Sequence, residues 1–247
     1  YKANGYKAVW TGRSAKDKAR RSALLRAIAD APMHGLPQRA YDVDTLKINL
    51  RSVKSERDLG RIEVQMSKIF LDYARDIQTG VLTPSQIDSE IVRKVPLRSR
   101  TSLLATLVKS NPKSFMRALP PKSPEYARLM KTKLEYEKVI GRGGYGPRVA
   151  AKSLKPGASN QSVIQLRNRL IAMGYLKRNA ATSYDDRMRN AVAAFQRDHG
   201  LFTDGVAGAR TMAAINTSAA ARLSQIVVAM ERDRKSTRLN SSHPSRS

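Results

Sequence analysis

The sequence predicts an all-α protein, with a helical assembly followed by a small three-helix bundle. Apolar residues recur at intervals of three and four in one segment after another, which is the period of an amphipathic helix. Serine followed three residues later by aspartate, at Ser14 with Asp17 and at Ser55 with Asp58, marks two helix starts. Residues 14–140 show none of the apolar–polar alternation that predicts strands.

The first helices can be placed in order. Residues 1–13 are aromatic-rich and predict a short helix or turn, and the helix that begins at Ser14 is expected to end at Gly35. Residues 41–50 predict a short helix or an irregular connection. The strongest helix follows Ser55 and ends at Gly80, and its apolar positions are Leu59, Ile62, Met66, Ile69, Phe70, Tyr73 and Ile77.

Prolines punctuate the rest of this region. Thr83 with Pro84 predicts a short helix, and the helix around residues 103–108 is expected to stop at Asn111-Pro112. Residues 115–119 predict a brief turn, and Ser123 with Pro124 begins another helix. We therefore expect a helical domain over residues 1–140.

Residues 141–153 are expected to form a linker, because glycine and proline concentrate there. Residues 154–216 predict a compact bundle of three short helices, with a core of Leu166, Leu170, Val192, Phe195 and Ile215. Residues 217–234 predict one more helix. Residues 235–247 are polar, serine-rich and without periodicity, so we expect them to be disordered.

The charge balance favours polyanionic partners. The chain has 46 basic and 20 acidic residues, a formal net charge of +26. Nucleic acid, anionic lipid surfaces and an anionic cell wall would all suit this balance, and so would a set of solvated basic helix faces. The basic residues are spread along the whole chain and no recognition-helix motif accompanies them, so specific nucleic-acid binding is not expected. A basic helical nucleic-acid-binding protein remains the alternative reading.

The residue types in the sequence give little indication of a catalytic site. The chain has no cysteine, which excludes a thiolate nucleophile and thiolate metal sites within these residues. Asp185 and Asp186 sit at a helix start, where acids suit the dipole, and Glu231 and Asp233 resemble a solvated helix face. The three histidines lack ligand spacing, so we expect neither a metal nor a cofactor.

Residues 184–215 carry the most specific motif. A helix that ends at His199-Gly200 is followed by a loop in which Asp204-Gly205 favours a turn with positive φ, and a second helix starts near Ala209. With its flanks, the unit 154–216 resembles the peptidoglycan-binding domain of many cell-wall enzymes. The matching residues are Leu154, Gly157, Val163, Leu166, Gly174, Tyr175, Ala191, Val192, Phe195, Gln196, Gly200, Leu201, Asp204, Gly205, Gly208 and Thr211. Arg167 and Arg189 depart from the family's usual glutamine and threonine.

This resemblance implies peptidoglycan as a partner and directs attention to polar residues near the loop ends. The candidate peptidoglycan-binding residues are Tyr184, Gln196, His199, Asp204 and Arg210. Helix capping and surface solvation are the alternative roles for the polar members of this set. Val192 and Phe195 are expected to be core residues.

Residues 1–140 resemble the helical scaffold region of the large L,D-transpeptidases of Gram-negative bacteria. The matching residues are Tyr6, Trp10, His34, Gly35, Leu36, Tyr41, Leu71, Tyr73, Ala74, Gly80, Pro84, Pro120, Tyr126, Leu129 and Tyr136. In that family a wall-binding domain follows the scaffold, and a helix ending Glu-Arg-x-Arg, here residues 231–234, leads into a cysteine-dependent catalytic domain. The resemblance implies a non-catalytic N-terminal portion of such an enzyme, truncated before its catalytic domain. It also implies a place in the periplasm or cell envelope, where anionic envelope surfaces are further possible partners.

Overall fold

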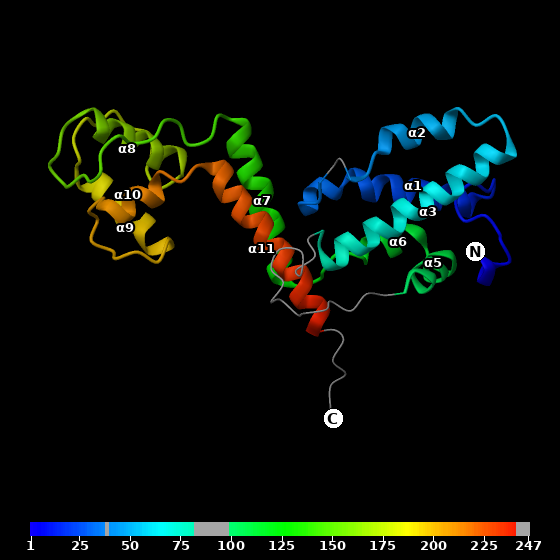
Figure 1. The fold of residues 1–247 in the computed structure, drawn as a ribbon. Helices are drawn as coiled ribbons and strands as arrows, with labels where there is room; N and C mark the ends of the chain where they lie inside the picture. Colours follow the sequence, from blue (N-terminus) through cyan, green and yellow to red (C-terminus); the bar gives the residue numbers. More distant parts are fainter. Residues whose placement is uncertain (38–39, 82–98, 241–247) are drawn as a thin grey trace, which may run out of the picture. The chain divides into compact units, whose positions relative to one another are not determined.

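The computed structural model describes residues 1–37, 40–81 and 99–240, and helices form its regular structure (Figure 1). The predicted all-α class is confirmed. Within the described residues, pairing of the β type is confined to two isolated bridges, Leu154 with Ala207 and Ser159 with Ser183. The chain divides into two compact units, Tyr1–Thr132 with Ile226–Ser247, and Lys133–Gln225. Each unit is described by itself.

The first unit contains the elements η1 (Lys2–Asn4), α1 (Ala15–Ala29), η2 (Ala31–His34), α2 (Val43–Arg51), α3 (Glu56–Thr79), α5 (Arg100–Lys109) and α6 (Pro112–Arg117). It also holds the first part of α7 (Pro124–Gly141). The capping box of Ser14 with Asp17 and the N-cap of Ser55 are present as predicted. The predicted short helix at Thr83 lies outside the described residues.

Helix α3 supplies the centre of this unit's core. Met66, Phe70 and Ile77 on its inner face are fully buried, and the single tryptophan, Trp10, packs on Phe70 with ring centroids 5.6 Å apart. Helix α3 contacts α2 and α5, while α1 contacts α2 and α6. The regular apolar spacing along residues 59–77 therefore predicted the element around which the unit packs.

Two differences from the predicted elements have local causes in proline. Helix α1 ends at Ala29, and the stop at Gly35 belongs to η2, because Pro32 cannot donate the bond that would continue an α-helix. The segment predicted as a turn over residues 115–119 begins within helix α6. Asn111 caps this helix by accepting from the Ser114 N–H, and Pro112 occupies its first turn.

The second unit contains the rest of α7, α8 (Gln161–Ala172), α9 (Asp186–Asp198) and α10 (Ala209–Ile215). The predicted core is confirmed, because Leu166, Leu170, Val192, Phe195 and Ile215 are all buried in one cluster. Buried Arg169 connects two segments of this unit by hydrogen bonds. Its guanidinium donates to the Ile215 carbonyl at 2.7 Å and to the Gly146 carbonyl at 2.8 Å, which ties the segment before α8 to the end of α10.

Helix α11 (Ala219–Asn240) begins in the second unit and continues into the first. The sequence predicts disorder from Lys235, whereas the structure continues the helix through Asn240; residues 241–247 lie outside the described residues. No glycine or proline separates Arg234 from Asn240, so nothing in the backbone chemistry forces an earlier end. Among the described residues, no helix is both long enough and apolar enough to span a bilayer.

Candidate functional site

The loop between α9 and α10, residues 199–208, is the centre of the candidate site. Asp204 folds it locally, since one carboxylate oxygen accepts from the Val206 N–H at 2.9 Å. This bond, with one from the Gln196 side chain, lowers the pKa of Asp204 below its ordinary value. Gly205 adopts φ +70°, the left-handed conformation expected for the glycine of an Asp-Gly turn. The loop is thus held in one shape from within.

Gln196, near the end of α9, fixes this loop to the bundle. Its amide oxygen accepts from the Gly205 N–H at 2.9 Å. Its amide nitrogen lies 2.9 Å from the Asp204 carboxylate oxygen, 3.0 Å from the Val206 carbonyl oxygen and 3.1 Å from the Thr211 hydroxyl oxygen. The side chain is 1% exposed, so its hydrogen-bonding capacity is directed at the protein itself.

Two further contacts complete the loop's support. The Tyr184 hydroxyl donates to the Gly205 carbonyl at 2.8 Å, and burial raises the pKa of this phenol. Leu154 and Ala207 exchange backbone hydrogen bonds of 2.9 and 3.0 Å, so the segment before α8 pairs with the end of the loop. A buried amide, a buried phenol and a short backbone pairing therefore hold one exposed turn in place.

The comparisons with known families agree with this division of the chain. Residues 1–132, more than half of the sequence, match the family described as a scaffold domain. The chain belongs to this scaffold-domain family. Residues 159–215 match a second family, described as a putative peptidoglycan binding domain, and the α9–α10 loop lies inside that match. This second match supports peptidoglycan as a partner and a cell-envelope location. A search of curated proteins gave no match.

In this scaffold-family chain the five candidate residues fall into two groups. Tyr184 and Gln196 are 2% and 1% exposed, and both bond to the loop backbone. These two buried side chains hold the conformation of the loop. Asp204 and Arg210 are exposed, and His199 is partly exposed, so these three can be reached by a ligand. The structure joins Tyr184, Gln196 and Asp204 through the loop by hydrogen bonds, and places His199 and Arg210 at its two ends.

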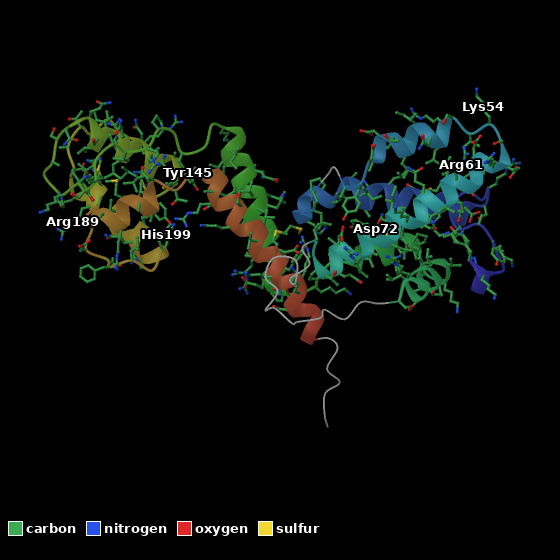
Figure 2. The ribbon with its side chains drawn as sticks, in the orientation of Figure 1. Lys54, Arg61, Asp72, Tyr145, Arg189 and His199 are labelled. Carbon is green, nitrogen blue, oxygen red and sulfur yellow. The ribbon has the colours of Figure 1, made fainter. Side chains whose placement is uncertain are left out.

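His199 belongs to a small aromatic cluster at the end of α9. Its ring stacks on Phe195 at a centroid distance of 3.9 Å, and its Nδ1 lies 2.8 Å from the Phe195 carbonyl oxygen. Tyr175 packs edge-on against Phe195 at 5.3 Å and donates its hydroxyl to Asp198 at 3.0 Å. His199 and Arg189 lie towards opposite ends of α9 (Figure 2). The imidazole is therefore oriented by its neighbours and retains one edge for a ligand.

Sequence reasoning missed Phe202, which lies within the loop. Its side chain is 84% exposed, the highest value among the large hydrophobic residues described. A bare phenyl ring on a turn that the protein holds rigidly contributes nothing to the core, and exposed aromatic rings are common at binding surfaces. Its position between Leu201 and the Asp-Gly turn was the available signal, because loop residues usually lie at the protein surface.

The described residues contain no group of three or more His, Asp or Glu placed to hold a metal ion. The loop and its flanks offer an aromatic ring, a carboxylate, an imidazole and a guanidinium, which suit non-covalent binding.

Gly205 provides a direct test of how tightly the loop is held. A Cβ at Gly205 would lie 2.9 Å from the Arg189 carbonyl oxygen, whereas one at Gly200 would meet nothing within 4 Å. Both glycines have positive φ, +70° and +65°, so alanine at either is strained by about 1–2 kcal/mol. We expect Gly205→Ala to lower the free energy of unfolding by about 1 kcal/mol more than Gly200→Ala, because the clash adds to the strain. Urea denaturation followed by circular dichroism measures both, and equal losses would contradict the close approach to Arg189.

Proposed function

We propose that the protein binds peptidoglycan through the α9–α10 loop, with Phe202, His199, Asp204 and Arg210 as the contacting residues. The observation that carries this proposal is a hydrogen-bonded loop inside the peptidoglycan-binding match that exposes an aromatic ring. Tyr184 and Gln196 act in this proposal by fixing the loop's shape.

The chemistry of these side chains suits a glycan that carries peptides. The Phe202 ring offers an apolar face to the C–H groups of a sugar. The carboxylate of Asp204 and the imidazole of His199 can accept hydrogen bonds from hydroxyl and amide groups. Arg210 lies in the first turn of α10, where the helix dipole disfavours a positive charge. Its placement is better explained by attraction to carboxylates of the stem peptides.

We further propose that the chain is the non-catalytic N-terminal portion of an L,D-transpeptidase that cross-links the cell wall. A scaffold domain followed by a wall-binding domain, in this order, supports this parentage. With no cysteine among its residues, this chain contributes binding rather than acyl transfer. Its location would be the periplasm of a Gram-negative bacterium, where its excess of positive charge would also favour anionic envelope surfaces.

Co-sedimentation with purified sacculi tests the binding claim. At moderate salt, we expect the wild-type chain to sediment with sacculi and Phe202→Ala to bind roughly fivefold more weakly, equivalent to about 1 kcal/mol. Tyr6→Ala in the scaffold domain is the matched control, because Tyr6 is also highly exposed, at 75%. Arg57→Ala, at another exposed arginine, is the control for Arg210→Ala. Comparing the two distinguishes a specific contact made by Arg210 from an effect of the overall positive charge.

Two outcomes would contradict the proposal. Wild-type protein that stays in the supernatant would remove wall binding. Equal losses for the loop variants and their controls would show that charge and exposed apolar surface act without a defined site. A duplex DNA titration over a range of salt concentrations covers the alternative, because a steep salt slope would indicate phosphate contacts.

A further inference from the structure

The scaffold domain contains a groove that the peptidoglycan-binding proposal does not use. It has a volume of about 500 Å³ and is lined by residues of α1, η2, α3, α6 and the first turns of α7. Figure 1 labels the four α-helices among these elements. All the residues that line the groove belong to the first unit. The volume lies within the range of sites that bind small molecules or short peptide segments.

Small side chains on two of the helices that line the groove leave space in it. Ala23 and Ala27 are one turn apart on α1, and Ala127 lies on the first turn of α7. Protein interiors are normally close-packed, so a longer side chain at any of these positions would fill part of the space. The groove therefore depends on residue size at three defined positions.

The floor of the groove is apolar and well fixed. Tyr73, Met116 and Tyr126 line it, and all three are buried. The Tyr126 hydroxyl lies 3.1 Å from His34 Nδ1, and the Arg234 guanidinium lies over the Tyr126 ring at 5.6 Å. Met116 adds an adaptable side chain of the kind found at peptide-binding surfaces. The floor thus combines two rings held by contacts with one side chain that can adapt to an apolar ligand.

The rim is positively charged. Arg26 on α1 and Lys113 and Arg117 on α6 line the groove and are exposed, against one acid, Asp30. In the part of the chain that the structure describes, none of these three cations forms an ion pair. Three unpaired cations around an apolar floor give the groove a charge that an acidic ligand would complement.

We propose that this groove binds a short acidic peptide segment of a partner protein. An apolar side chain of the segment would lie on the floor formed by Tyr73, Met116 and Tyr126. Carboxylates on either side of it would meet Arg26, Lys113 and Arg117. The apolar contact supplies affinity, and the charged rim selects an acidic sequence and speeds its association.

The floor separates this ligand from two other polyanions. Stem peptides of peptidoglycan carry carboxylates but mostly small side chains, so they would leave the floor unfilled. Nucleic acid would meet the rim through its phosphates, and its backbone carries no apolar side chain for the floor. A large apolar residue flanked by acids uses both features of the groove.

Fluorescence anisotropy on the full chain, with labelled synthetic pentapeptides, tests the proposal. The probe is Glu-Asp-Phe-Asp-Glu, and its partner Glu-Asp-Gly-Asp-Glu has the same charge without the apolar side chain. At physiological salt, we expect the phenylalanine peptide to bind at least fivefold more tightly. Equal binding of the two peptides would overturn the proposal, because the floor would then contribute nothing.

Charge-reversal variants locate the interaction. Lys113→Glu with Arg117→Glu should weaken binding of the phenylalanine peptide at least tenfold. Arg57→Glu with Lys68→Glu makes the same change in net charge at exposed positions on α3 and should weaken it less than twofold. Similar losses for the two pairs would attribute binding to the overall charge and overturn the proposal.

Filling variants test the space itself without changing charge. Ala27→Leu on α1 and Ala127→Leu on α7 each place a larger side chain in the lining of the groove, and each should weaken binding at least fivefold. Trp10 fluorescence during denaturation shows whether a variant remains folded. If one variant does not fold, the other is sufficient for the test. Unchanged binding in a folded variant would overturn the proposal, as would tighter binding of a purified stem peptide than of the phenylalanine peptide.

Discussion

Replacing Glu63 by alanine is expected to release the N-terminal segment and to lower the free energy of unfolding of the scaffold domain by about 3–5 kcal/mol. Glu63 lies on α3 and is only 8% exposed. Its carboxylate accepts from the backbone N–H groups of Val9 at 2.6 Å, Trp10 at 3.0 Å and Thr11 at 2.8 Å. Alanine would leave these buried or partly buried donors without a partner, and each such loss is costly.

Trp10 provides the measurement for this prediction. It is the only tryptophan, it is fully buried, and its indole N–H donates to Ser67 at 2.8 Å. A red shift of its emission together with a lower urea midpoint would show that the segment has detached. Glu56→Ala, an exposed glutamate at the start of the same helix, is the control and should change stability by a few tenths of a kcal/mol. Comparable effects of the two substitutions would contradict a special role for Glu63.

The same carboxylate should make the stability of the scaffold domain depend on pH. Burial by itself would raise the pKa of Glu63, but the hydrogen bonds from Tyr1, Val9, Thr11 and Trp10 outweigh it and lower the pKa. A lowered pKa means that the stabilisation is complete above the unfolded-state value of about 4.3 and is lost as the pH falls through the folded-state value. The stability difference between wild type and Glu63→Ala should therefore be constant near neutral pH and shrink in acid. A constant difference down to pH 2 would contradict this linkage.

Periodicity and capping signals in the sequence predicted most of the helices and the second unit's core. The apolar stripe of residues 59–77 and the pairs Ser14 with Asp17 and Ser55 with Asp58 act through contacts within one or two turns, so local spacing is enough to reveal them. Asn111-Pro112 shows the limit of such signals, because one dipeptide both ends α5 and begins α6.

Buried charged residues could not be predicted in this way. Glu63 bonds to residues more than fifty positions away, and Arg169 bonds to a carbonyl 46 positions away. Arg234 bonds to Tyr126 across 108 positions. In the sequence each looks like one more charge on a helix, and only the fold brings the partners together. The candidate loop shows the same limit, since motif position suggested Gln196 as a contact residue but could not show that its amide is buried.

Replacing Gln196 by glutamate should therefore disrupt the α9–α10 loop by changing one atom, with an expected loss of about 2–4 kcal/mol in the free energy of unfolding of the second unit. The amide oxygen that accepts from the Gly205 N–H would be retained. The amide nitrogen, however, would become an oxygen placed about 3 Å from the Asp204 carboxylate and the Val206 carbonyl, which are both acceptors. Two buried donors would be lost and a like charge would face Asp204.

The pH dependence and the wall affinity of Gln196→Glu distinguish a structural role from a contact role. Burial beside Asp204 would raise the pKa of the new carboxyl, and its protonation restores one donor, so the stability loss should shrink as the pH falls towards the unfolded-state value of about 4.3. If Gln196 acts only by holding the loop, the variant should also lose sacculus binding, and acidification should restore both properties together. Hydrogen exchange at the Gly205 N–H follows the loop directly. Full stability with reduced binding at neutral pH would instead place Gln196 in contact with the ligand and contradict the role we assign to it.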